Sequence, residues 1–268
     1  MKVISWNVKF DNSTAEQSIN KLLENEQADV FCFQEINKDI LKFLKNKHQF
    51  QLHYELETTK NLNQTNELKT YVVILSKYVI LNKGKVHIVE PNKKISKVTK
   101  YLQKYLKKHS TMFENYTSEY AIYIDIKRLS DHKQFRIFNT HLKRFTTPIN
   151  RIHQFKKLIH IMDRTKQNII CGDFNIMDTF LSKFSGTIFN SSLKDNFKFN
   201  ERNEFEDIFK IHKFQNPFSK QSTFNFKKII NLQLDHILVP EHTKVKNQKV
   251  LEIKKYNSDH APIYLEIE

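Results

Sequence analysis

Apolar runs that end in polar side chains recur along the chain. Residues 2–8 alternate between apolar and polar positions, which predicts a strand. Residues 29–33 and 71–78 are rich in β-branched and aromatic residues and predict buried strands. Residues 120–127 and 135–141 predict two paired strands joined by a polar turn. We therefore expect a sheet scaffold to carry the rest of the chain.

Helical spacing occurs between the predicted strands. Residues 15–27 carry an apolar stripe, with Ser13 or Thr14 as the N-cap. Two further helices are predicted, one that begins near Arg151 and one around residues 204–214. The chain thus alternates between strands and helices from end to end.

Residues 92–109 have a different pattern, because apolar residues recur at helical spacing while lysines take most other positions. This predicts a basic amphipathic helix. Such a helix suits a phosphate backbone or an anionic membrane, although a solvated helix packed on a sheet is the commoner case. The lysines that we assign to a substrate-binding face are Lys97, Lys100 and Lys104.

The stretch from residue 169 to residue 175 organises the chain. An apolar run reaches a glycine and then presents Asp173 and Asn175, two positions apart. Alternate residues of an extended segment point the same way, so these two side chains face one side while Phe174 turns into the core. Asp and Asn are also common wherever a strand gives way to a turn, so this motif alone does not identify a site.

Five other strand ends along the chain carry comparable side chains. Each lies at or just past the end of an apolar, β-branched or aromatic run. Strand ends on a sheet scaffold can converge, so carboxylates, amides and imidazoles at these positions predict one polar cluster. The residues are Asn7, Glu35, His141, Asp235, Asp259 and His260.

In this order the motifs resemble the endonuclease/exonuclease/phosphatase superfamily, the group that contains exonuclease III, DNase I, neutral sphingomyelinases and inositol polyphosphate 5-phosphatases. The resemblance covers nearly the whole chain. It implies one domain over residues 1–268 with a four-layered α/β sandwich, in which two mixed β-sheets pack face to face with helices outside. His141 within the sequence Thr-His-Leu places the chain in the histidine-containing, DNase I-like branch.

The resemblance also implies a metal site. Glu35 would be the main ligand, with Asn7 and Asp259 completing an oxygen-donor set for Mg²⁺, or for Mn²⁺ as an alternative. Read without the other motifs, Glu35 is better explained as an ordinary surface glutamate that begins a helix over residues 36–47.

Catalytic roles follow from the same family pattern. His260 would pair with Asp235 and act on the phosphoryl oxygens, and Asp173 would orient or deprotonate the attacking water. Asn175 would donate to a phosphoryl oxygen, and His141 would be the acid or transition-state donor. A carboxylate orients this histidine in DNase I-like members, and Glu57 and Glu67 are both candidates. Substrate contacts are assigned to Arg151 and Phe224, in addition to the lysines; a core position is the simpler interpretation of Phe224.

Length and composition agree with a single globular domain. Hydrophobic residues make up 39% of the 268 residues, enough for a sizeable core. No apolar run approaches the roughly 18 residues of a membrane span, and the first residues lead directly into a strand without a signal-peptide pattern. Cys32 and Cys171 lie in apolar strands and are expected to be buried, reduced thiols of a cytoplasmic protein.

The formal charge of +15 suggests a polyanionic partner. The abundance of Lys, Asn, Ile and Phe is also what A/T-rich codons produce, so the charge supports a nuclease without establishing one. The leading hypothesis is a monomeric Mg²⁺-dependent nuclease that acts on DNA, or less readily on RNA. The alternatives are a phosphoesterase for a sphingomyelin or phosphoinositide head group or a 5′-tyrosyl-DNA adduct, and an inactive scaffold that docks through residues 92–109.

Overall fold

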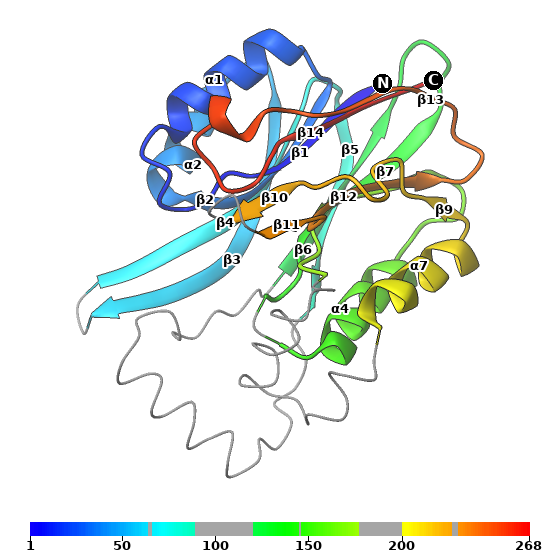
Figure 1. The fold of residues 1–268 in the computed structure, drawn as a ribbon. Coiled ribbons are helices and arrows are strands. Elements are labelled where there is room, and N and C mark those ends of the chain that lie inside the picture. Colours follow the sequence, from blue (N-terminus) through cyan, green and yellow to red (C-terminus); the bar gives the residue numbers. More distant parts are fainter. Residues whose placement is uncertain (64–65, 89–119, 145, 177–199, 227–229) are drawn as a thin grey trace.

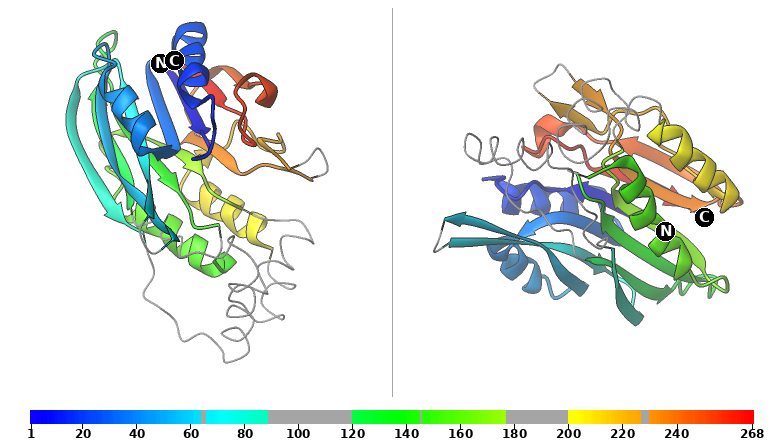
Figure 2. Two further views of the ribbon diagram at one scale, coloured as in Figure 1. Left: turned by 90° about the vertical axis from the view of Figure 1, so that its left-hand side faces the viewer. Right: turned by 90° about the horizontal axis from the view of Figure 1, so that it is seen from below.

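Two six-stranded sheets pack face to face, and helices cover both outer faces (Figures 1 and 2). The structure, a computed structural model, describes residues 1–268 except 64–65, 89–119, 145, 177–199 and 227–229. Helices α1 (Ala15–Glu26) and α2 (Lys38–Lys45) cover the first sheet, whereas α4 (Pro148–His160) and α7 (Glu201–Ile211) cover the second. The predicted four-layered α/β sandwich is confirmed.

The first sheet joins the two ends of the chain. Strand β1 pairs in parallel with β2 and antiparallel with β14, and the remaining pairs are antiparallel. In spatial order the strands are β13 (Val245–Val250), β14 (Ile263–Ile267), β1 (Lys2–Asn7), β2 (Val30–Asn37), β4 (Asn66–Ser76) and β3 (Gln51–Asn63).

The second sheet is also mixed, with one parallel pair, β7 and β8, among antiparallel neighbours. In spatial order its strands are β5 (Ile80–His87), β6 (Tyr120–Lys127), β7 (Gln134–His141), β8 (Gln167–Asp173), β12 (Asp235–Pro240) and β9 (Phe214–Gln215). A short hairpin, β10 (Phe224–Phe226) and β11 (Ile230–Leu232), and the 3₁₀ turn η2 (Ile253–Lys255) lie beside the sandwich.

Side-chain alternation along the strands separates an inner core from two outer cores. In β2, Cys32 faces the core between the sheets while Phe31 and Phe33 pack under α1 and α2. In β8, Cys171 faces the inner core while Ile170 packs under α4 and α7. Both cysteines are free and fully buried, which confirms the prediction of buried thiols.

Element boundaries differ from the predictions where tertiary pairing decides them. The helix expected from residue 36 begins at Lys38, because Ile36 and Asn37 still pair with β4 and the Asn37 side chain caps the helix by accepting from Ile40 N. The helix expected around residues 204–214 begins earlier, at Glu201, because Asn200 provides its cap. The predicted lysine-rich helix over residues 92–109 lies outside the described residues.

Candidate active site

Polar side chains meet where the central strands of both sheets end. Ile169 and Cys171 face the inner core, so Asp173, two residues further on, shares their face at the end of β8. The strand register sets Asp173 opposite His141 on one side and Asp235 on the other. In the first sheet, Asn7 at the end of β1 lies opposite Gln34, next to Glu35. The structure therefore brings the predicted strand ends together.

Asp173 is the centre of this cluster. Its Oδ2 atom lies 3.0 Å from Asn7 Nδ2, 3.4 Å from His141 Nε2 and 3.7 Å from His260 Nε2. Its Oδ1 atom accepts a hydrogen bond from the Asn175 backbone N–H at 2.9 Å, which fixes the carboxylate plane. A buried carboxylate held between two imidazoles and an amide is suited to orienting a water molecule or accepting its proton.

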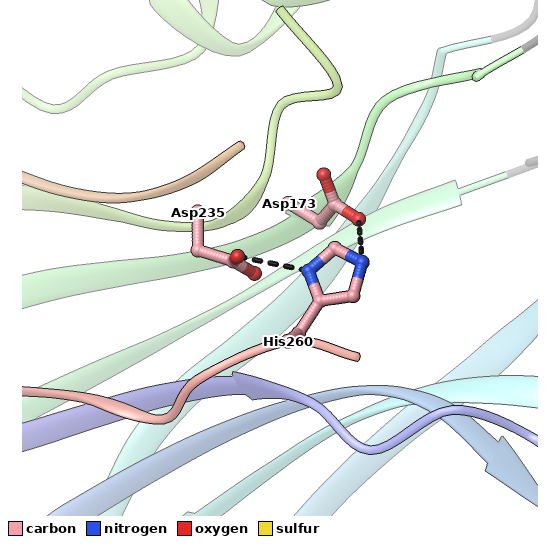
Figure 3. Close-up of side chains that lie close together, drawn as sticks. All are labelled: Asp173, Asp235 and His260. Carbon is pink, nitrogen blue, oxygen red and sulfur yellow. Dashed lines mark hydrogen bonds and ion pairs between the residues drawn. The ribbon is translucent and has the colours of Figure 1, made fainter. Parts of the chain in front are cut away.

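Each imidazole is held from behind by a second carboxylate. His260 Nδ1 lies 2.9 Å from Asp235 Oδ2, and its Nε2 atom points to Asp173 (Figure 3). On the other side, His141 Nδ1 bonds to Glu57 Oε1, so Glu57 on β3 is a carboxylate that orients this histidine. Two carboxylate–imidazole pairs thus direct their Nε2 atoms at the same oxygen of Asp173.

The carboxylates keep both imidazoles cationic. Burial acts to lower the pKa of His141, but the charges of Glu57 and Asp173 outweigh it and raise the pKa to about 10. Burial likewise opposes the charges of Asp235 and Asp173 on His260, and the net result is a pKa of about 9. The cluster therefore offers two N–H donors with positive charge, which is what a developing phosphoryl oxyanion requires.

Glu35 stands beside this cluster in an unusual backbone conformation. The register of β2 shifts between Phe33 and Ile36, and Glu35 has a φ of 56°. Its backbone N–H donates to Glu57 Oε2 at 2.8 Å, and its side chain accepts from Asn7 Nδ2 and Phe10 N, both at 3.2 Å. Burial acts to raise the Glu35 pKa, but the charge of His141 and the Asn7 hydrogen bond lower it overall.

These donors fit a hard divalent cation. Mg²⁺ takes oxygen ligands and is usually bound through one or two carboxylates. Glu35 Oε1 and Asp173 Oδ2 both accept from Asn7 Nδ2, at 3.2 and 3.0 Å, so the two carboxylates lie on either side of one amide nitrogen. Asp173, Asp235 and His260 also place one ligand atom each within 4.8 Å of one another, and Asp235 Oδ1 is buried without a hydrogen-bond partner. We favour the side with Glu35, because Mg²⁺ prefers oxygen ligands, whereas the group of Asp173, Asp235 and His260 includes an imidazole nitrogen.

The other predicted site residues occupy varied positions. Asp259 is half-buried, and its backbone carbonyl accepts from Asn225 N at 3.0 Å. Asn175 has a φ of 50°, and its Nδ2 atom donates to Leu142 O at 3.0 Å. Phe224 is buried and packs against the ring of His260, with centroids 4.8 Å apart. Lys97, Lys100 and Lys104 lie outside the part of the chain that the structure describes.

Three residues that the sequence did not assign support the cluster. Thr223 Oγ1 donates to Asp235 Oδ2 at 2.8 Å and accepts from the Asp235 backbone N–H. Gln34 Nε2 donates to Asn139 Oδ1 at 2.7 Å and thereby links the two sheets beneath the site. Gln34 and Asn139 lie within the sequence motifs of Glu35 and His141, so their proximity to the site was visible, but their mutual bond was not.

Arg151, predicted to contact substrate, is not among the residues that converge. Its guanidinium is buried, donates to both oxygens of Glu201 at 2.6 and 2.7 Å, and donates to backbone carbonyls of residues 143, 144 and 146. These contacts tie α4 to α7 and to the chain that follows β7. The structure therefore supports a structural role for Arg151.

Arg151→Gln is expected to lower the free energy of unfolding by about 3–5 kcal/mol, because it breaks the buried two-point ion pair with the Glu201 carboxylate. Urea denaturation measures the change. Arg151→Gln combined with Glu201→Gln should recover part of the loss, since no isolated charge then remains. If Arg151→Gln were as stable as the unchanged protein but bound substrate more weakly, Arg151 would contact substrate as predicted from the sequence.

His236 is a buried histidine next to the site that stays neutral. Its ring stacks on Phe174 with centroids 4.6 Å apart, and Nδ1 bonds to Leu234 O at 3.0 Å. Burial first, and then the charge of Arg202, lower its pKa from 6.5 to about 3. As the pH falls below 6.5 the unfolded chain binds a proton on this ring while the folded protein does not, so stability is lost between pH 6.5 and about 3.

His236→Gln is therefore expected to reduce the acid sensitivity of the fold. Glutamine can still donate to Leu234 O but binds no proton. The free energy of unfolding of the unchanged protein, relative to the variant, should fall by about 1.4 kcal/mol per pH unit below about pH 6. Urea unfolding of both proteins at intervals down to about pH 4 measures this difference. Titration of the carboxylates affects the stability of both proteins equally and therefore does not contribute to the difference. Parallel curves would show that His236 does not titrate in this way.

The paired sheets and the cluster of carboxylates, amides and imidazoles at their edge are features of hydrolytic phosphoesterases. The family model described as Endonuclease/Exonuclease/phosphatase family matches residues 4–260, and the chain belongs to this family. The resemblance stated from the motifs is thereby confirmed. The family acts on phosphate esters and generally depends on a divalent metal ion.

Solved structures share the fold at low sequence identity. A family protein from Leptotrichia buccalis is 16% identical with a TM-score of 0.68, over 100% of this chain and 99% of that one. The human Nocturnin catalytic domain with a bound sulfate anion is 16% identical with a TM-score of 0.65, over 100% and 93% of the two chains. A mannosyl-6-phosphatase from Bacteroides thetaiotaomicron is 16% identical with a TM-score of 0.61, over 100% and 99%. A search of curated protein sequences finds no match.

Proposed function

We propose that this protein is a Mg²⁺-dependent nuclease that hydrolyses phosphodiester bonds in DNA. The observation that carries the proposal is the pair of imidazoles, His141 and His260, that direct Nε2 at the same oxygen of Asp173 beside Glu35. Hydrolysis of a phosphate ester requires positive charge at the phosphoryl oxygens and an oriented water molecule. This arrangement supplies groups for both.

Glu35, with Asn7 and Asp259, would hold Mg²⁺, which supplies Lewis-acid polarisation of a phosphoryl oxygen when bound. Asp173 Oδ2 would orient the attacking water and accept its proton. The imidazolium N–H groups of His141 and His260 would donate to the phosphoryl oxygens that gain charge, and His141 can release its proton to the leaving oxygen. Asn175 uses one N–H on Leu142 O and retains a second for a phosphoryl oxygen.

A groove on the outer side of the second sheet also suits a polyanionic substrate. A groove of about 540 Å³ lies between β5 and α4, and none of the described residues that line it is acidic. His87, His153, Lys156, Lys157 and His160 line it.

The proposal is tested by incubating the protein with Mg²⁺ and supercoiled plasmid, single-stranded DNA, abasic duplex or RNA, and in parallel with sphingomyelin and phosphoinositide. Consumption of DNA, dependent on Mg²⁺ and abolished by chelation, is expected. Consumption of a lipid alone would overturn the nuclease assignment while leaving the phosphoesterase class intact.

A second candidate function has one observation in its favour. A largely apolar pocket of about 550 Å³ lies between the β10–β11 hairpin and η2, next to the segment that carries His260. Val250, Leu251, Ile253 and Ala261 line it. An ester with an apolar substituent, such as a lipid, suits such a lining. The lipid arms of the same assay test this alternative.

Removal of Lys97, Lys100, Lys104 and Lys108 by substitution to Ser should flatten the salt dependence of DNA binding. Each phosphate contact that is lost should reduce the log–log slope by roughly 0.9. Hydrolysis of a small chromogenic phosphodiester should not change, because the catalytic cluster is untouched. Binding is measured between about 50 and 200 mM salt. An equal loss of charge elsewhere, Lys244, Lys246, Lys249 and Lys255 to Ser, serves as the control and should leave the slope unchanged.

A further inference from the structure

The row of catalytic side chains continues across the second sheet to its edge. Asp235, Asp173 and His141 lie opposite one another on β12, β8 and β7. On β6, Ile122 lies opposite Asn139, and the same register continued by two residues sets Tyr120 level with His141. On β5, His87 lies opposite Tyr120. Tyr120 and His87 therefore share the face and the end of the sheet that carry the catalytic groups.

Contacts with the first sheet support this placement independently. On β3, Glu57 bonds to His141, and Glu55, two residues earlier, bonds to Lys85 Nζ at 3.1 Å. The same Lys85 Nζ lies 4.6 Å from the centre of the Tyr120 ring. Glu57 and Glu55 of β3 thus bind His141 and Lys85, so this strand faces both His141 and the lysine that lies over the Tyr120 ring.

The two rings form an aromatic pair at this end of the sheet, with Lys85 Nζ over the Tyr120 ring. Tyr120 and His87 have ring centroids 5.3 Å apart at an interplanar angle of 57°, with His87 exposed and Tyr120 half-buried. The buried rings around the site, such as Phe224, pack into the cores, whereas this pair is not enclosed. Neither ring contacts Asp173, so neither serves in the chemistry described above.

We propose that Tyr120 and His87 bind a nucleobase adjacent to the scissile phosphate by stacking. The inference rests on the proposed nuclease function. Tyr120 lies one strand from His141 and His87 lies two strands away, and neighbouring strands are about 4.8 Å apart. A nucleoside attached to a phosphate bound at His141 would reach these two rings. Every base has a π-face, so a stacking surface accepts DNA of any sequence, whereas a lipid or inositol head group offers no such face.

The test compares binding of thymidine 3′,5′-bisphosphate with binding of the abasic deoxyribose 3,5-bisphosphate, by titration calorimetry with Mg²⁺ present. The protein should bind the thymidine compound about tenfold more tightly, since stacking on one base typically contributes a factor of this order. Tyr120→Ala should remove most of that preference and leave the abasic compound unaffected, and Tyr120→Phe should retain it. His87→Ala should reduce it in part.

Tyr54 provides a matched control. It is also a half-buried tyrosine with a lysine over its ring, Lys45 Nζ at 4.6 Å, but it packs on the outer face of the first sheet. Tyr54→Ala should preserve the preference for thymidine. Equal binding of both compounds by the unchanged protein, or an unaltered preference in Tyr120→Ala, would overturn the inference.

The proposed function fails separately, on the absence of DNA cleavage. If DNA is cleaved but Tyr120→Ala keeps its preference for the base, only the stacking site is rejected. If the base preference depends on Tyr120 but no DNA is cleaved, the nuclease assignment is rejected and the nucleotide site stands.

Discussion

Glu35→Gln is expected to reduce Mg²⁺-dependent hydrolysis by at least about a thousandfold while leaving the fold intact. Glutamine keeps the shape of the side chain but removes the charge that holds the cation. Loss of several kcal/mol of charge stabilisation in the transition state corresponds to this factor. The Glu35 backbone N–H still donates to Glu57, so the strand end should keep its conformation.

The measurement is kcat at a series of Mg²⁺ concentrations, together with thermal unfolding. Glu24→Gln, the same chemical change at an exposed position of α1, is the control and should behave like the unchanged protein. Rates within about threefold of the unchanged protein at saturating Mg²⁺ would show that Glu35 is not the principal ligand.

Asp173→Asn is expected to lower kcat by roughly 10²–10⁴-fold, the range that a positioned general base contributes. The substitution leaves a side chain of the same size among Asn7, His141 and His260 but removes the acceptor for the water proton. Substrate binding should be retained, because the imidazoles remain. A drop in kcat with little change in KM is therefore the expected signature.

The same variant has a second readout. The charge of Asp173 is one of the causes that raise the pKa values of His141 and His260, to about 10 and about 9. NMR titration of Asp173→Asn should show both pKa values lowered. Asp207→Asn on the exposed face of α7 is the control for both measurements. Unchanged histidine titration with unchanged kcat would remove Asp173 from the centre of the site.

The sequence predicted those features that depend on strand periodicity. Asp173 follows two inward-facing residues of an apolar run. Its position at the end of a strand could therefore be predicted without knowing which strands pair with it. Glu57 could not be selected, because its contact with His141 depends on how β3 registers against β4 and on how the two sheets face each other. The register shift that turns Glu35 toward Glu57 likewise leaves no signal in its own residues.

The ion pair of Arg151 could not be predicted from the sequence either. From the sequence Arg151 was assigned to a substrate contact, but its partner Glu201 lies 50 residues further along the chain. Sequence reasoning had no reason to pair them. Buried polar groups require partners, so an arginine on the inward face of a helix indicates a distant acid as readily as a ligand.

The site is assembled from segments that lie more than 200 residues apart in the sequence. Asn7 and Glu35 come from the start of the chain, His260 comes just before β14, and β14 itself occupies the edge of β1 that would otherwise stay unpaired. A nascent chain that still lacks residues 258–267 has neither His260 nor the strand that closes the first sheet. The polar cluster therefore cannot be complete until residues 258–267 have been synthesised and β14 has paired with β1.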